Sequence, residues 1–398
     1  MDVKIGPLNN VRVLDFTRVY AGPYCTLLLG DMGADIIKIE QPEIGDDTRN
    51  FLPIKNGESG YFMYLNRNKK SITLNLKSIE GHKIAMRLAK DADVIVENFS
   101  PGTMKSLGLD YDTIKKINPK VIYASISGFG QTGPLKKKVA YDIVVQAMSG
   151  LIGVTGYPEY PPVKVGCSIA DANVGVHCAL GIVSALFHRE RSGEGQYIDV
   201  AMLDSMVSVM ENLFVQYTLS GIIPQRIGND SKTTAPFAMF HSKDSYVVIA
   251  ASNNKVFKRL AEAMEKSELL KNEKFNSNQH RVKNFEELRK LMEEWTQQYT
   301  TEEIVNMLDE ARVPVAPILS IKDVTELPQL KEREMFVEND HPICGKFLTP
   351  GFPIKFSETP GQISKAAPLL GEDTVYILKN KLKMSDSEIE ELRKNHVI

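Results

Sequence analysis

The sequence lacks several features that would assign it to particular protein classes. Its four cysteines, Cys25, Cys167, Cys178 and Cys344, are scattered, so no CxxC pair indicates a zinc or dithiol site. There is no basic excess, because 48 Lys and Arg stand against 50 Asp and Glu, which argues against nucleic acid as a partner. No run of about 18 consecutive apolar residues or signal-peptide core occurs, so we expect no membrane association. Free thiols suit a reducing compartment, and we expect a cytoplasmic protein.

What the chain does have is the balance of a folded enzyme. Its 398 residues are 43% apolar and 25% charged, enough for two or three domains at roughly 150 residues each. The first half alternates short apolar runs with helical stretches, which predicts parallel βαβ units in a doubly wound α/β sheet. The expected strands are residues 11–15, 35–40, 93–97 and 121–126, and the expected helices begin at Gly22 and Ser78.

The pattern changes after residue 203. A helix over 203–219 leads into a polar stretch, and the segments 238–240 and 246–250 flank a turn and predict a hairpin. Helices rich in Lys and Glu follow to about residue 311. We therefore expect a smaller α+β domain at 225–325. A final helix is expected near 385–394, in a tail long enough to return to the first domain.

The first strand–turn–helix is where an open parallel sheet would bind a nucleotide. Its turn, Asp15–Pro23, is not GxGxxG, which disfavours a nicotinamide dehydrogenase. Glu40 ends the second strand and can accept from a ribose or merely close the strand. Basic clusters at 67–70 and 136–138 are expected on loops, either as solvated surface or as phosphate-binding groups. Coenzyme A carries a diphosphate and a 3′-phosphate, so two clusters would suit it.

Asp171 lies between Gly166 and Gly175, where an apolar run meets a helix reaching about His188. Two roles are open: it caps the helix, or it is an ionised nucleophile at a positive helix end. His177 and His188 share a face of that helix, but no carboxylate cluster accompanies them, so we expect no metal site.

These residues fall within a longer pattern. The chain resembles the class III CoA-transferases, the family that includes formyl-CoA:oxalate and carnitine CoA-transferases, over nearly its whole length, and is most similar to the succinyl-CoA:glutarate type. Eight segments in order carry the resemblance: Val13–Pro23, Gly33–Glu40, Asn66–Ser71, Val96–Gly102, Ser127–Pro134, Asp171, Ser192–Gln196 and Pro368–Gly371.

The resemblance implies a fold and a reaction. Residues 1–224 and 326–398 would form a large Rossmann-like CoA-binding domain, 225–325 an inserted smaller domain, and two chains an interlocked homodimer. Asp171 would be the nucleophile that moves CoA from an acyl-CoA to a free carboxylic acid, through an aspartyl anhydride and an aspartyl-CoA thioester. Acyl-CoA is then a substrate, and no tightly bound cofactor is expected.

The resemblance also implies binding residues. Val19, Tyr20 and Ala21 match the loop beside the thioester, with Tyr20 where oxalate-type enzymes often have Gln. Asn253 and Asn254 stand in place of their glycine loop, so formyl-CoA and oxalate are not expected as substrates. Gln41 replaces a frequent arginine beside the nucleotide. The matched CoA contacts are Lys38, Glu40, Asn68, Lys70, Phe99, Met104, Lys105 and Lys138.

Two other functions remain open. The α-methylacyl-CoA racemases share this fold and use a histidine where Tyr141 stands, so one acid/base group of that reaction is missing here. A non-catalytic CoA-binding protein would not need Asp171. For the transferase we expect a small dicarboxylate such as succinate or glutarate, with Arg18, Arg226 or Lys255 binding its distal carboxylate. Carnitine, aromatic acids and bile acids remain possible acceptors.

Overall fold

The computed structural model describes residues 6–398, which form two compact units. The first comprises the chain through Ser149 together with Val165–Phe214 and Gln329–Ile398, and the second comprises Gly150–Lys164 and Val215–Pro328. Residues 1–5 of the first expected domain lie outside the described residues.

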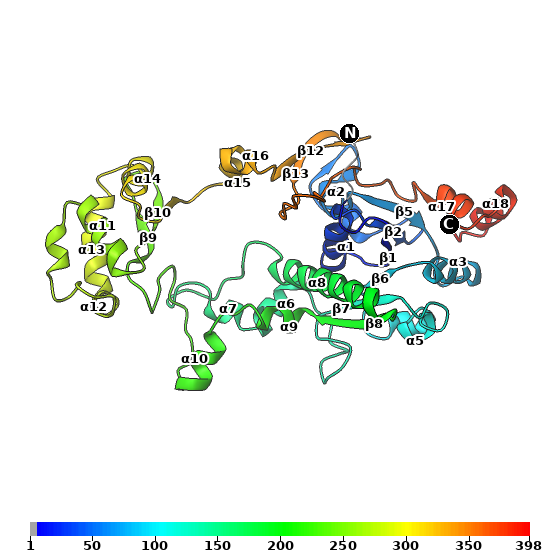
Figure 1. Ribbon diagram of the computed structural model, residues 1–398, viewed down its shortest axis with the longest axis horizontal. Helices are drawn as coiled ribbons and strands as arrows, with labels where there is room; N and C mark the ends of the chain where they lie inside the picture. Colours follow the sequence, from blue (N-terminus) through cyan, green and yellow to red (C-terminus); the bar gives the residue numbers. More distant parts are fainter. Residues whose placement is uncertain (1–5) are drawn as a thin grey trace. The chain divides into compact units, whose positions relative to one another are not determined.

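The first unit is built on a six-stranded sheet in which all neighbouring strands are parallel (Figure 1). This confirms the predicted α/β class with a large parallel sheet. Renumbered along the sheet's own strands, the order is the 3-2-1-4-5-6 of dinucleotide-binding folds. The strands in spatial order are β5 (Lys69–Thr73), β2 (Asp35–Glu40), β1 (Arg12–Asp15), β6 (Val94–Glu97), β7 (Ile122–Ser127) and β8 (Gln196–Ala201).

Four of these strands were expected from their apolar runs, and β5 and β8 were not. The expectation that 67–70 is an exposed loop cluster is wrong, because Lys69 and Lys70 begin β5 and Lys69 is fully buried. Arg67 is buried as well, with its guanidinium on Asp31. These charges are buried because the fold supplies partners far away in the sequence.

Helices cover both faces of the sheet. Alternate side chains such as Leu14, Ile37 and Ile95 share a core with α3, α5, α17 and α18. The opposite face contacts α1 and α8. The helices concerned are α1 (Ala21–Asp31), α3 (Ile79–Lys90), α5 (Tyr111–Ile114), α8 (Ile169–Ser192), α17 (Thr374–Asn380) and α18 (Asp386–Lys394).

The carboxyl-terminal segment packs into the same unit. The α17 helix lies beside β5, and the Asp373 carboxylate accepts from the Ser71 amide. The α18 helix begins after Ser385, as expected, with a capping box between Ser385 and Glu388. The segment before it forms the hairpin of β12 (Phe336–His341) and β13 (Gly345–Pro350).

Smaller elements of the first unit lie between the sheet strands. Several border the site described below. They are η1 (Asp47–Asn50), β3 (Ile54–Lys55), β4 (Glu58–Ser59), α2 (Gly60–Asn66), α4 (Thr103–Ser106), α6 (Asp142–Met148) and α9 (Met202–Val207).

The helix α8 is long and apolar enough, by length and composition, to cross a membrane. Core helices of water-soluble proteins pass the same test. One side of α8, including Val174, Cys178 and Ile182, is buried within the unit. We therefore describe it as a core helix with a second, more exposed side.

The second unit has its own core. The expected hairpin is confirmed as β9 (Phe237–His241) and β10 (Tyr246–Ala250), which β11 (Val315–Pro317) extends to three strands. The expected helix over 203–219 is wrong, because the chain breaks into α9 and α10 (Leu213–Ser220). The other helical elements near or within this unit are α7 (Leu151–Val154), α11 (Asn254–Ala263), η2 (Ser267–Leu270), α12 (Asn278–Lys283), α13 (Phe285–Thr296), α14 (Thr301–Glu310), α15 (Ile321–Glu326) and α16 (Pro328–Glu332).

Candidate active site

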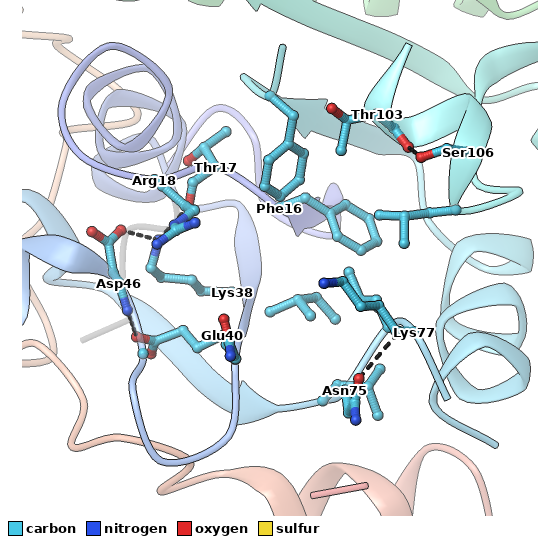
Figure 2. Close-up of a pocket in the computed structure, with 17 residues that line it drawn as sticks. Phe16, Thr17, Arg18, Lys38, Glu40, Asp46, Asn75, Lys77, Thr103 and Ser106 are labelled. Atoms are coloured by element: carbon cyan, nitrogen blue, oxygen red, sulfur yellow. Dashed lines mark hydrogen bonds and ion pairs between the residues drawn. The ribbon is translucent and has the colours of Figure 1, made fainter. Parts of the chain in front are cut away.

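A cavity of about 380 Å³ opens at the carboxyl ends of the central strands. The chain leaves β1 and β6 in opposite directions along the sheet, and this is where such folds bind nucleotides. Figure 2 shows the lining from the loops after β1, β2, β5 and β6. Three predicted CoA residues, Lys38, Glu40 and Phe99, are among the lining residues, together with the candidate cation Arg18.

The charges of Lys38 and Glu40 are already paired inside the protein. The Lys38 ammonium forms an ion pair of 2.9 Å with Asp46 and donates to the carbonyl of Thr17. The Glu40 carboxylate accepts two hydrogen bonds of 2.8 Å from Arg49. Both residues shape the wall of the cavity, while their charged ends are directed to protein partners.

A neighbouring cavity of about 260 Å³ contains two other predicted CoA residues, Met104 and Lys105. The short helix α4 separates the two cavities, since Thr103 and Ser106 line the first and Met104 and Lys105 line the second. Glu97 lies in the second cavity, and burial raises its pKa to about 7.

The remaining predicted CoA residues lie elsewhere. Asn68 precedes β5, where its amide oxygen accepts from the backbone of Ser364 and Lys365. Lys70 pairs with Asp35, the first residue of β2, so it lies toward the amino edge of the sheet, away from the cavity. Lys138 is in an exposed loop, over the ring of Phe129. The structure does not bring these three residues together with Lys38 and Glu40.

Asp171 lies in the first turn of α8. Ser168 is the residue directly before this helix. Its carboxylate does not cap the helix, so that proposed role is not observed. Asp142, at the start of α6, accepts instead from the amides of Ala170 and Asp171, at 2.7 and 3.3 Å. The other Asp142 oxygen accepts from Gln146. Asp142, rather than Asp171, therefore occupies the end of the helix.

The surroundings of Asp171 favour its neutral form. Burial raises its pKa to about 7, and the negative charge of Asp142 adds to this shift. A carboxyl group that titrates near neutrality is typical of functional sites.

An aromatic cluster reaches this turn through Tyr61. Tyr61 of α2 lies close enough to Asp171 that, after burial, the charge of Asp171 helps to raise the pKa of Tyr61 to about 12. The Tyr61 ring meets those of Tyr20 and Phe51 edge to face, with centroids 6.1 and 5.5 Å apart. Tyr20 also stacks on Tyr24. Tyr61 is thus the member of this cluster that lies next to Asp171.

The predicted thioester loop reaches this turn through α1. A Cβ on Gly175 would lie 2.9 Å from the carbonyl oxygen of Ala21, so α8 and α1 approach closely there. Among the described residues 6–398, the backbone amides of Ala21 and Gly22 donate to no acceptor. Val19 has a φ of +67°, which a β-branched residue rarely adopts.

Three predicted acyl-site residues have other surroundings. Tyr141 precedes α6 and is 71% exposed. Asn253 and Asn254 belong to the second unit, where Asn253 caps α11 and Asn254 accepts from Arg281. Arg226 and Lys255 also lie in that unit, and the guanidinium of Arg226 donates to the carbonyls of Tyr157, Pro158 and Tyr160.

Sequence reasoning missed Asp142, Tyr61 and Asp46. Asp142 stands next to the singled-out Tyr141, and this proximity was the available signal. Tyr61 and Asp46 lie in segments without a distinctive pattern. Within the described range 6–398, no three His, Cys, Asp or Glu side chains group as a metal site would require.

Comparisons with known proteins agree with this architecture. Residues 8–374 match the CoA-transferase family III. The chain is 38% identical to human succinyl-CoA:glutarate CoA-transferase, covering 98% of this chain and 89% of that protein. It is 40% identical to acetyl-CoA:oxalate CoA-transferase of Acetobacter aceti, covering 94% and 95%. A CAIB/BAIF family structure from Brucella suis aligns with a TM-score of 0.85 and 38% identity over 94% of this chain and 98% of that one.

The chain belongs to CoA-transferase family III, and it is a CoA-transferase whose substrates are CoA thioesters. The predicted family and enzyme class are confirmed.

Proposed function

We propose that this enzyme transfers CoA from an acyl-CoA to a small dicarboxylate, with Asp171 as the nucleophile. The observation that carries the proposal is that two neighbouring acids, Asp142 and Asp171, have different hydrogen-bond partners. Asp142 accepts from the amides at the start of α8, and the Asp171 carboxylate beside it has no such task. It lies beside Tyr61, whose ring packs on Tyr20, and its helix closely approaches Ala21 of the Val19–Ala21 loop.

The reaction proceeds by four exchanges at carbonyl carbon. The Asp171 carboxylate attacks the thioester, the C–S bond breaks, and an aspartyl anhydride and CoA thiolate form. The thiolate attacks the aspartyl carbonyl, which releases the first acid and leaves an aspartyl-CoA thioester. The acceptor carboxylate attacks that thioester to form a second anhydride and free the thiolate again. The thiolate then attacks the acyl carbonyl, giving the new acyl-CoA and regenerating Asp171.

Two features of the site suit this sequence. The amides of Ala21 and Gly22 at the start of α1 can donate to the oxyanion that forms in each step. The rings of Tyr20 and Tyr61 restrict water, which would otherwise hydrolyse the anhydride and the thioester.

A dicarboxylate acceptor is supported by the relatives, since glutarate and oxalate in their names are both dicarboxylates. Arg18 is the candidate cation in the first unit for the distal carboxylate. Arg18 precedes Val19 and forms an ion pair with Asp47, and both side chains are partly exposed. A substrate carboxylate can therefore replace Asp47 as the partner of Arg18.

Arg18→Gln should raise KM for a dicarboxylate about tenfold and leave KM for a monocarboxylate unchanged. Equal increases in KM for both acids would exclude Arg18 as the residue that binds the distal carboxylate.

We also propose that the enzyme is a homodimer and that it lies in the cytoplasm, a reducing compartment that suits its free cysteines. The dimer is supported by the exposed side of α8, where Val176, Leu180 and Phe187 are 47%, 62% and 59% exposed. Light scattering during gel filtration should give twice the chain mass of 44.5 kDa, and a monomer mass would refute the dimer.

The function is tested by mass spectrometry in deuterated buffer. Succinyl-CoA, acetyl-CoA and a 2-methylacyl-CoA are each incubated with glutarate, oxalate, mesaconate and butyrate. New acyl-CoA without deuterium at the α-carbon is the expected result. Deuterium at the α-carbon of 2-methylacyl-CoA without any CoA exchange would instead show a racemase.

A further inference from the structure

The loop between β1 and α1 is fixed by protein groups at three consecutive residues. Lys38 donates to the Thr17 carbonyl at 2.7 Å. Asn98 accepts from the Arg18 amide and donates to the Arg18 carbonyl, both at 2.8 Å. Asp46 accepts from the Val19 amide at 3.2 Å. The loop is thus held from the Thr17 carbonyl to the Val19 amide.

This degree of fixation coincides with a strained residue. Val19 has the left-handed φ of +67°, which crowds a β-branched side chain. Such a backbone conformation is kept only where several contacts with the surrounding structure fix it, and it is common at functional sites. The loop continues directly into Tyr20 and Ala21, which border the turn of Asp171.

The surroundings of Asp46 stabilise its ionised form. It is 2% exposed, and one of its oxygens also accepts from the amide and hydroxyl of Thr48. The other oxygen forms the ion pair with Lys38, as Figure 2 shows. Burial opposes ionisation, but the Lys38 charge outweighs it and lowers the pKa of Asp46 to about 2.

We propose that Asp46 and Lys38 are a positioning pair that holds the Val19–Ala21 loop in its left-handed form against the Asp171 turn. The proposal rests on the proposed function of Asp171 and extends it to residues that touch no reacting atom. Lys38 binds Thr17 at one end of the turn, and Asp46 binds Val19 at the other. Their mutual ion pair joins the two ends. The predicted contact of Lys38 with CoA stays a prediction, and the proposal gives this residue a second role through the loop.

The first test is Asp46→Ala, with succinyl-CoA and glutarate as substrates. We expect kcat to fall about a hundredfold, the effect of a misplacement near 1 Å, while KM for succinyl-CoA changes by less than about threefold. Hydrogen–deuterium exchange of the peptide spanning 16–21 should become at least about tenfold faster. Unchanged kcat per folded enzyme, or unchanged exchange in this peptide, would overturn the proposal.

The second test uses the strain itself. Glycine adopts a positive φ freely, so Val19→Gly should reduce the need for the pair. The double variant Asp46→Ala/Val19→Gly is expected to recover at least about tenfold in kcat over Asp46→Ala. A purely structural role for Asp46 predicts no recovery, and that result would refute positioning.

Glu43→Gln is the matched control. Glu43 lies three residues before Asp46, and its exposed carboxylate is 3.7 Å from His396 and does not contact the loop backbone. Its kcat should stay within about threefold of wild type, with normal exchange of the loop. A loss equal to that of Asp46→Ala would refute a specific role for Asp46.

If Asp46→Ala does not fold, Asp46→Asn keeps an oxygen for the Val19 amide and removes the charge opposite Lys38. A tenfold lower kcat with faster loop exchange is then expected, and wild-type values of both would overturn the proposal. If the wild-type enzyme transfers CoA to no acid of the panel, the proposed function fails, whereas the exchange measurement still decides whether Asp46 and Lys38 hold the loop.

Discussion

Two acidic regions of the first unit differ in how their carboxylates are paired. Between the sheet and α1, Asp15 bonds Lys69, Thr17 and Thr26, and all of these groups are fully buried. At the start of α8, Asp171 has another acid, Asp142, as its charged neighbour. Burial opposes ionisation in both regions. The pKa of Asp15 is nevertheless lowered, because Lys69 and Lys38 outweigh burial, whereas the pKa of Asp171 is raised to about 7.

If Asp171 is the nucleophile as proposed, the difference separates a carboxylate that maintains the fold from one that reacts. A buried carboxylate with cationic and hydroxyl partners is stabilised as an anion and is a poor nucleophile. A carboxylate left beside a second acid is destabilised as an anion, and covalent bonding to an acyl group removes that charge. Substitutions in the two regions should therefore have opposite effects on activity and stability.

The largest effect is expected for Asp171→Asn. The amide cannot attack a thioester, so CoA transfer should fall at least about a thousandfold while the protein remains folded. Exchange of succinyl-CoA with glutarate, followed by mass spectrometry, measures this loss. Asp204→Asn, in the first turn of α9, is the control and should retain activity. Turnover above a tenth of wild type in Asp171→Asn would exclude covalent catalysis at this residue.

The paired region should instead lose stability. Lys69→Met leaves Asp15 buried without its ammonium partner, and the free energy of unfolding should fall by about 3–5 kcal/mol. The same substitution at Lys274, whose ion pair with Glu287 is exposed, should cost about 1 kcal/mol or less. Urea unfolding compares the two variants. Equal costs would show that burial does not distinguish these pairs.

Removing the unpaired charge should stabilise the protein. Since the Asp171 pKa is about 7 when folded and 3.8 in the reference state, its contribution to stability is complete below about pH 4 and is lost as the pH rises through about 7. Asp171→Asn has no such loss. It should exceed wild type by about 2–4 kcal/mol at about pH 8 and by much less at about pH 4. Urea unfolding at both pH values measures the difference, and a constant difference would contradict the raised pKa.

The smallest effect concerns the neighbouring acid. Asp142→Asn keeps an oxygen for the amides at the start of α8 and removes the charge that adds to the Asp171 shift. The apparent pKa on the acidic side of the profile of kcat against pH should fall by less than about one pH unit. A rise in this pKa would mean that Asp142 stabilises the ionised form of Asp171 rather than opposing it.

Much of the sheet could be predicted because its strands contain short apolar runs, such as Val94, Ile95 and Val96 in β6. β5 could not be predicted, because it begins with two lysines whose partners, Asp15 and Asp35, are far away in the sequence. The break between α9 and α10 lies in an apolar stretch that a helical period also fits. Local patterns show which residues tend to be buried, but they do not show which distant charges accompany them.

The candidate site shows the same limit. Asp171 was selected by its glycine neighbours and by the family resemblance, and its nucleophilic role remains a prediction. The group that caps α8, Asp142, lies 28 residues before Ala170 and belongs to another helix. The pairing of Lys38 with Asp46 spans only eight residues, but Asp46 lies in a segment without a distinctive pattern, so the sequence did not point to it. The predicted contact of Lys38 with CoA stays a prediction.

Gly175 extends this reasoning to a residue with no functional group. Since α8 rests on the carbonyl of Ala21 at this position, a hydrogen atom sets the spacing between the helix of Asp171 and the loop beside the thioester. A single methyl group at this position would push α8 and the start of α1 apart. If the proposed mechanism holds, the alignment of Asp171 with the thioester would therefore depend partly on a residue without a side chain, which a search for reactive groups would overlook.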